Sequence, residues 1–142
     1  MAHSLTMVLT NRRSELERVA QAVHRFGEEH GLPHADVVDV DLVLDEIVTN
    51  VIEHGYEGAR EGDHEIHLAM TLTGGTLTIE VADQGQPFNP LDAPPPNLDL
   101  PLEERPIGGL GIFLVKSLTT TIDYRRDSGR NILTMTKAIR DR

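Results

Sequence analysis

The sequence predicts an α/β two-layer sandwich with helices on one face of a mostly antiparallel sheet. The predicted elements follow in the order strand, two helices, two strands, long loop, helix, two strands. The helices carry apolar residues at every third or fourth position, and the strands alternate apolar with polar residues. This alternation indicates that one sheet face is covered and the other faces water.

The composition fits one folded unit with an aliphatic core. The chain has 142 residues, of which 39% are hydrophobic and only 4% aromatic, with no tryptophan. A chain of this length buries about two thirds of its potential surface, which is enough for one core. We therefore expect a single domain over residues 1–142.

The first elements are a strand and an amphipathic helix. Residues 3–9 suit a short strand, and residues 14–30 suit a helix with apolar residues at helical spacing. Ser14 followed by Glu17 predicts a capping box at the start of this helix. Gly31 predicts its end.

A second helix follows at once. Pro33 suits its first turn. Its apolar stripe consists of Val37, Val40, Leu44, Ile47 and Val51. We expect this helix to run to about Glu53 and to end before Gly55.

Two hairpins and a proline-rich loop make up the second half. Gly74-Gly75 predicts a turn between alternating segments at 66–72 and 77–81. Seven of the eight prolines fall within 86–107, a density that excludes regular structure. A loop of this length in a compact domain is typical of a lid or a binding loop.

The chain then closes with a helix and a hairpin. Gly108-Gly109-Leu110-Gly111 leads into a short helix that we expect to reach Leu118. Segments 120–126 and 131–138 read as strands around the turn at 127–129.

Several classes of protein and site are not expected. The absence of cysteine excludes disulfides and thiolate metal sites. No apolar run reaches the ~20 residues that span a membrane, and the N-terminus lacks the layout of a signal peptide; we expect a soluble, cytoplasmic protein. A net charge of −10 with scattered basic residues argues against direct nucleic-acid binding. The histidines lack zinc-site spacing, and His54 is interpreted as a capping or packing residue.

Glu46 and Asn50 form the first candidate site. They are four residues apart, so they share one helix face, roughly opposite the apolar stripe. One interpretation is a solvated polar face. The other is a carboxylate base beside an amide oxygen that ligates a hard cation such as Mg²⁺. A glutamate of ordinary pKa, about 4.3, is ionised at neutral pH without further tuning.

Asp83 and Gly85 form the second candidate site, at the end of a predicted strand. An acid and a glycine there fit an ordinary turn. They also fit a carboxylate that accepts a hydrogen bond from an adenine amino group, with glycine allowing close approach of the backbone. Both interpretations remain open on these residues alone.

The glycines at 108–111 form the third candidate site. Glycine-rich chain that opens a helix presents free N–H groups and the positive end of the helix dipole to an anion. The alternative is a flexible hinge. The pattern matches neither the Walker A motif nor the Rossmann fingerprint.

In this order, and separated by the long loop, the three stretches resemble the ATP-binding domain of the gyrase, chaperone, histidine-kinase and mismatch-repair (GHKL) superfamily. The resemblance covers nearly the whole chain and implies a Bergerat-type fold with an ATP lid at 89–107. Residues 45–56, 83–88 and 108–112 look most like the anti-sigma factor serine/threonine kinases of the RsbW and SpoIIAB type.

The resemblance implies a role for each candidate residue. Glu46 is expected to be the general base, and Asn50 to hold Mg²⁺ beside ATP. Asp83 is expected to read the adenine and Gly85 to shape the base pocket. The remaining nucleotide contacts implied by the resemblance come from Arg105, Gly108, Gly109, Leu110 and Gly111. Arg105 is placed at the γ-phosphate, with an ordinary surface arginine as the alternative.

The resemblance also implies an activity and partners. It implies an ATP-dependent serine/threonine kinase that phosphorylates a small antagonist protein and binds a sigma factor or another regulatory protein, as a homodimer. A protein that sequesters its target without significant kinase activity is the main alternative. A detached ATPase module is the third.

One feature departs from the superfamily pattern. The last strand lacks the Gly-Thr pair that often supports the adenine-binding aspartate. Asn131 or Thr134 could take that place, and the sequence leaves the choice open.

Overall fold

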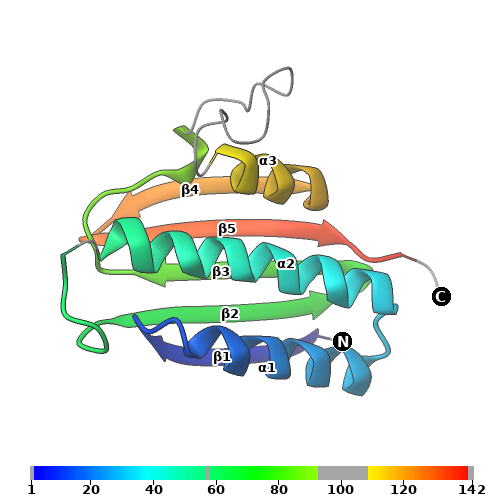
Figure 1. The fold of residues 1–142 in the computed structure, drawn as a ribbon. Helices are drawn as coiled ribbons and strands as arrows, with labels where there is room; N and C mark the ends of the chain where they lie inside the picture. Colours follow the sequence, from blue (N-terminus) through cyan, green and yellow to red (C-terminus); the bar gives the residue numbers. More distant parts are fainter. Residues whose placement is uncertain (1, 57, 93–108, 141–142) are drawn as a thin grey trace, which may run out of the picture.

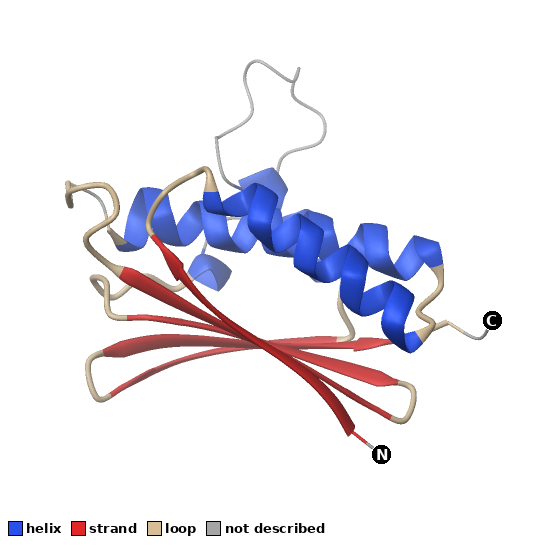
Figure 2. Cartoon of the chain, turned by 90° about the horizontal axis from the view of Figure 1, so that it is seen from below, coloured by secondary structure: helices blue, strands red, loops and turns tan. Residues whose placement is uncertain are grey.

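The computed structural model describes residues 2–56, 58–92 and 109–140. The elements are β1 (Ala2–Thr10), α1 (Glu15–His30), α2 (His34–Asn50), β2 (Glu65–Thr73), β3 (Thr76–Asp83), α3 (Gly109–Leu118), β4 (Thr121–Asp127) and β5 (Arg130–Ala138). Two short turns add η1 (Val51–Gly55), which is π-helical, and η2 (Pro90–Asp92), which is 3₁₀. In the described part of the chain, the helices lie against one face of the sheet (Figures 1 and 2), so the predicted two-layer sandwich is confirmed.

The sheet has five strands in the order β1-β2-β3-β5-β4, and every neighbouring pair is antiparallel. The last strand of the chain, β5, is therefore inserted between β3 and β4. Figure 1 shows β5 lying between β4 and β3. This insertion places Asp83, the last residue of β3, directly opposite Asn131 near the start of β5.

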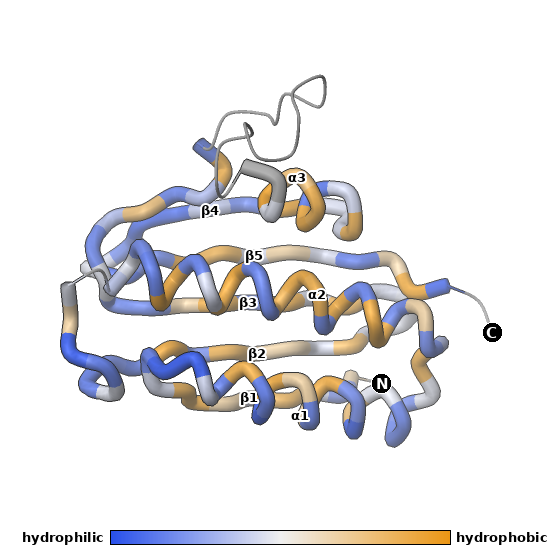
Figure 3. The backbone as a smooth tube through the Cα atoms, viewed as in Figure 1, coloured by the Kyte–Doolittle hydropathy of each residue, from blue (hydrophilic) through white to orange (hydrophobic). Residues whose placement is uncertain are grey.

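The core fills the space between the helices and the covered face of the sheet, and it is aliphatic as predicted. In Figure 3 the tube of α2 shows orange, apolar segments alternating with hydrophilic ones along the helix. Alternate strand residues point into this layer, among them Ile66, Leu68, Met70, Leu77, Ile79 and Met135. Helix α2 contributes Val40, Val43, Leu44, Ile47 and Val48.

Helix α1 ends as predicted but begins differently. Gly31 adopts a left-handed conformation, with φ of 70°, and its N–H bonds to the carbonyl of Gly27. The predicted capping box is wrong, because Ser14 is itself in a helical conformation and makes no side-chain cap. Glu15 instead turns back toward β1 and accepts a 2.9 Å hydrogen bond from the N–H of Thr10.

The second helix ends at Asn50, but the helical run continues through η1 beyond the predicted end. Beyond Asn50 the chain widens into the π turn η1, where the N–H of Tyr56 bonds to the carbonyl of Val51 at 3.1 Å. The turn ends at Gly55 rather than before it. Because π turns are rare and occur frequently at functional sites, η1 makes this end of α2 a candidate functional region.

Both predicted hairpin turns are present. Gly74 in the first turn has a φ of 61°, and Ser128-Gly129 in the second turn have φ values of 52° and 79°. Positive φ at both central residues of a two-residue turn matches the twist of the flanking strands. The second turn fixes the register of β4 on β5, with Asp127 opposite Arg130.

A buried ionic cluster ties three elements together at the other end of α2. Lys137 of β5 is 6% exposed, and its Nζ lies 3.2 Å from Asp39 Oδ2 and 3.6 Å from Asp36 Oδ1. The same ammonium donates to the carbonyl of Leu118 at the end of α3. None of the described helices is long and apolar enough to cross a membrane.

Candidate functional site

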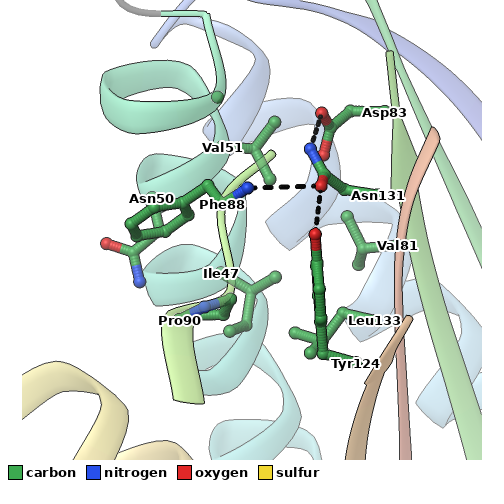
Figure 4. Close-up of a pocket in the computed structure, with 11 residues that line it drawn as sticks. Ile47, Asn50, Val51, Val81, Asp83, Phe88, Pro90, Tyr124, Asn131 and Leu133 are labelled. Carbon is green, nitrogen blue, oxygen red and sulfur yellow. Dashed lines mark hydrogen bonds between the residues drawn. The ribbon is translucent and has the colours of Figure 1, made fainter. Parts of the chain in front are cut away.

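A small pocket lies between α2 with η1 and the strands β3, β5 and β4 (Figure 4). Apolar side chains form most of its walls, and the segment after β3 lies across it. Its lining consists of Ile47, Asn50, Val51, Gly55, Val81, Asp83, Phe88, Pro90, Tyr124, Asn131 and Leu133. An apolar cleft with a few converging polar groups is the usual form of a small-molecule site.

Asp83 supplies the charged group at one end of this pocket. It is 4% exposed, and its Oδ1 accepts hydrogen bonds from the N–H of Gly85 at 2.8 Å and from Asn131 Nδ2 at 3.0 Å. Burial raises the pKa of Asp83 above its ordinary value, while these two hydrogen bonds and the nearby arginines, Arg126 and Arg130, lower it. The sequence placed this residue correctly at the end of a strand.

Gly85 lies so close to η1 that no side chain fits there. A Cβ atom built on Gly85 would fall 2.3 Å from the carbonyl oxygen of Gly55. The same carbonyl accepts a 2.9 Å hydrogen bond from the N–H of Gln86. Arg126 adds a 2.8 Å bond from its Nη1 to the carbonyl of Gly85. The turn that follows Asp83 is therefore held against η1 and β4.

Asn131 is the residue of the last strand that supports Asp83. Its side chain bonds Asp83 directly and is 5% exposed. Thr134 lies an odd number of residues further along β5, so its side chain points to the opposite face of the sheet. The structure thus settles the choice that the sequence left open between these two residues.

Tyr124 is a pocket residue that sequence reasoning missed. Its ring lines the pocket from β4, and its hydroxyl lies 2.5 Å from Asn131 Oδ1. The signal was present in the hairpin, because the register set at Ser128-Gly129 places Tyr124 opposite Leu133, another pocket residue. Phe88 was noted only as the end of the matched stretch 83–88, and Pro90 only as part of the proline-rich loop.

Asn50 does not lie on a solvated helix face, which rules out that interpretation for this residue. It is 7% exposed and faces the pocket beside Phe88 (Figure 4). The ring of Phe88 stacks on His54 at a centroid distance of 4.9 Å, and this pair closes over the end of α2. His54 is therefore a packing residue, as interpreted from the sequence.

Glu46 lies one helical turn before Asn50, about 6 Å along α2. Its pKa is raised from the ordinary value, first by burial and then by the charges of Asp45 and Glu53, while interaction with the Asn50 side chain lowers it. The expectation of an untuned glutamate is therefore corrected. A raised carboxyl pKa brings the group closer to the range in which a base can exchange protons near neutral pH.

The glycine motif meets Glu46 at the start of α3. A Cβ atom built on Gly111 would fall 1.9 Å from Glu46 Oε1, so the carboxylate rests against this glycine. Gly109 and Leu110 form the first turn of α3 with it. Gly108, Arg105 and most of the expected lid at 89–107 lie outside the described residues.

The arrangement provides one acceptor, apolar walls and a set of hard oxygen ligands. Among the described residues, no cluster of three or more His, Cys, Asp or Glu could hold a metal by itself. Asn50 and Glu46 offer an amide oxygen and a carboxylate, which fit Mg²⁺ when a bound phosphate and water supply the other ligands. Asp83 fits a group that donates a hydrogen bond, such as the amino group of a purine.

Comparison with known proteins gives a family match and relatives of similar length. Residues 9–137 match the family described as the histidine kinase-like ATPase domain. The serine-protein kinase RsbW of Bacillus mycoides (strain KBAB4) is 33% identical over 113 residues, which cover 77% of this chain and 68% of that protein.

Solved structures share the fold at lower identity. The RsbU and RsbW domains of Rv1364c from Mycobacterium tuberculosis match with a TM-score of 0.68 and 20% identity, over 96% of this chain and 32% of that one. This chain thus spans about a third of that longer protein. The SiaB–SiaC complex from Pseudomonas aeruginosa matches with a TM-score of 0.58 and 15% identity, over 94% and 89% of the two chains.

Proposed function

The chain belongs to the histidine kinase-like ATPase domain family, and from this premise we propose that it is an ATP-dependent serine/threonine protein kinase. Its proposed substrate is a small antagonist protein in a partner switch that controls a sigma factor or another regulator. The name of its relative RsbW, a serine-protein kinase, supports this choice of activity.

One observation supports the nucleotide proposal above all. A buried carboxylate, Asp83, lies at one end of an apolar pocket, and one wall of this pocket is α2, the helix of Glu46 and Asn50. Asp83 accepts from the amino group of adenine, and Ile47, Val51 and Leu133 pack on the base. The phosphates then extend toward the N-terminus of α3, where free N–H groups favour an anion. Mg²⁺, held in part by Asn50, would neutralise phosphate charge.

The transfer step uses Glu46 as the base. The hydroxyl oxygen of the substrate serine bonds to the γ-phosphorus, the bond between this phosphorus and the β,γ-bridging oxygen breaks, and ADP departs with that oxygen. The hydroxyl proton passes to Glu46. Positioning and charge neutralisation carry most of the rate in such reactions, so the protein need supply little covalent chemistry.

The remaining parts of the proposal concern organisation. We place the protein in the cytoplasm as a single-domain homodimer that holds either its antagonist or its regulatory target. The acidic chain, with a net charge of −10, suits a basic or neutral protein partner rather than nucleic acid.

The test is transfer of radiolabelled γ-phosphate from ATP to the antagonist-domain protein encoded by a neighbouring gene. The wild-type protein should label this partner on serine or threonine, whereas Glu46→Gln should bind ATP normally and label it about 10²–10⁴-fold more slowly, because a general base is lost. Asp45→Asn is the matched control, since Asp45 is the exposed neighbouring carboxylate. It should keep most of the activity.

The outcomes separate the candidate functions. ATP binding without any labelling of the partner would favour a sequestering protein. ATP hydrolysis at full rate without a partner would favour an ATPase module. Labelling at the wild-type rate by Glu46→Gln would remove Glu46 as the base.

A further inference from the structure

Tyr124 reaches the candidate base pocket from the edge strand β4, outside all three sequence motifs. Its ring lines the pocket, and its hydroxyl oxygen lies 2.5 Å from Oδ1 of Asn131 (Figure 4). Neither group is part of the pattern through which the chain resembles its family.

The orientation of the Asn131 amide follows from its neighbours. The backbone N–H of Phe88 can only donate and lies 3.3 Å from Oδ1, whereas the carbonyl of Gln86 can only accept and lies 2.9 Å from Nδ2. The oxygen of the amide must therefore face Phe88. Because Tyr124 faces the same oxygen, its hydroxyl is the donor in their hydrogen bond.

Every hydrogen-bonding position of the Asn131 side chain is used. Oδ1 accepts from Tyr124 and Phe88, and Nδ2 donates to Gln86 and to Oδ1 of Asp83. An asparagine side chain has two donor hydrogens and two acceptor lone pairs, so none remains for a ligand. Asn131 can act on a bound base only through Asp83.

These bonds distinguish the two oxygens of Asp83. Oδ1 already holds hydrogen bonds from Gly85 and Asn131, whereas Oδ2 receives none from the described residues. Fixing Oδ1 stops the carboxylate from rotating and leaves Oδ2 as the acceptor for a ligand. A fixed acceptor binds better because less side-chain freedom is lost on binding.

We propose that Tyr124 is a positioning residue for the nucleotide base. Its hydroxyl holds the Asn131 amide, and Asn131 in turn fixes the Asp83 carboxylate toward an exocyclic amino group of that base. This role rests on the proposed ATP-binding function. The Tyr124 hydroxyl is the closer of the two donors on Asn131 Oδ1, since the Phe88 N–H is 3.3 Å away. Without the Tyr124 hydroxyl, Oδ1 of Asn131 keeps only the long hydrogen bond from the N–H of Phe88.

The test compares two nucleotides that differ only in the group that Asp83 contacts. Calorimetry with Mg²⁺ would measure the Kd of ATP and of purine riboside triphosphate, which lacks the 6-amino group, for the full chain. Wild-type protein should prefer ATP. Tyr124→Phe should weaken ATP binding by about threefold to tenfold, the effect of one lost hydrogen bond, and leave the analogue nearly unchanged.

Two further variants make the test specific. Asn131→Ala should reduce the preference for ATP at least as much, and adding Tyr124→Phe to it should cause no further loss of preference, because the hydroxyl acts through Asn131. Tyr56→Phe is the matched control. Its hydroxyl also makes hydrogen bonds within the protein, but to the carbonyl of Glu65 and from the N–H of Gln84, so its loss should not alter the preference.

Equal weakening of both nucleotides by Tyr124→Phe, or no effect at all, would overturn the positioning role while leaving ATP binding intact. Additive loss of preference in the double variant would also overturn it. A wild-type protein that binds neither nucleotide would instead remove the proposed function on which the role rests.

Discussion

Two carboxylates in the pocket region, Asp83 and Glu46, have pKa values raised chiefly by burial. Desolvation disfavours the charged form of an acid, so each group carries its charge at a cost to the folded state. Hydrogen bonds from Asn131 and Gly85 to the Asp83 carboxylate stabilise its charged form and offset part of this effect. Glu46 instead faces two further acids, Asp45 and Glu53.

This difference predicts a pH-dependent stability effect at Glu46. A carboxyl whose pKa is higher in the folded state binds protons more tightly there, so the folded protein loses stability as pH rises from the ordinary value of 4.5 through the raised value. Glu46→Gln removes this loss. The variant should be more stable than wild type at about pH 7, and the difference should shrink as pH falls toward 4.5.

Urea denaturation at several pH values measures the effect. Glu28→Gln, an exposed glutamate on α1, should change stability little at any of them. A Glu46→Gln variant less stable than wild type at neutral pH would show that the carboxylate is stabilised, not strained, by its surroundings.

Both acids could be predicted as candidate site residues because the signal for each is local in the sequence. Glu46 and Asn50 are four positions apart and therefore share a helix face, and Asp83 stands at the end of a predicted strand. It could not predict that Asn50 is buried, since the cover comes from Phe88, which lies far away in the chain. Tyr124 was missed because its place depends on strand register and on which strand lies next to β5.

At the scale of elements, the site depends on the contact between α2 and α3. Gly111 in the first turns of α3 rests against the carboxylate of Glu46, and Lys137 ties the far end of α3 to α2 through Asp39. The start of α3 is thus held where a phosphate would meet the helix N-terminus.

Gly111→Ala tests this contact. Alanine is favoured over glycine in a helix by about 1 kcal/mol, but here its Cβ would displace the flexible end of Glu46. The two effects oppose each other in stability, so the free energy of unfolding should change little. Phosphotransfer should fall at least about tenfold, because a displaced base no longer meets the hydroxyl.

Gly27→Ala in α1 provides the contrast. Its Cβ would fall 2.5 Å from the stiff Val37 Cγ2, so this variant should lose stability yet keep phosphotransfer while folded. Normal phosphotransfer by Gly111→Ala would show that Gly111 does not set the position of the Glu46 carboxylate.

Element order and type were predictable because each element is longer than one period of its pattern, as in α2 and the β2–β3 hairpin. The ends of the elements were less predictable than their order and type. The capping box at Ser14 was wrong because Ser14 is itself in a helical conformation and makes no side-chain cap. The π turn after Asn50 has no simple local signal.

At the scale of the whole molecule, the insertion of β5 between β3 and β4 creates the pocket. It sets Asp83 opposite Asn131 and brings Tyr124 to the same end of the sheet. The order of strands is a long-range property, and alternation along each strand says nothing about which strand lies beside it. The fold class was therefore predictable from local pattern, whereas the order of the strands in the sheet was not predicted and comes from the structure.

The most direct measurement of the central claim is the affinity of the protein for ATP and for GTP with Mg²⁺, by calorimetry. Guanine presents a carbonyl oxygen where adenine has its amino group, and a buried acceptor facing Asp83 without a donor costs about 1–3 kcal/mol. We predict that ATP binds at least about tenfold more tightly than GTP and that Asp83→Asn loses most of this preference. Equal affinities for the two nucleotides in the wild-type protein would contradict an adenine site at Asp83.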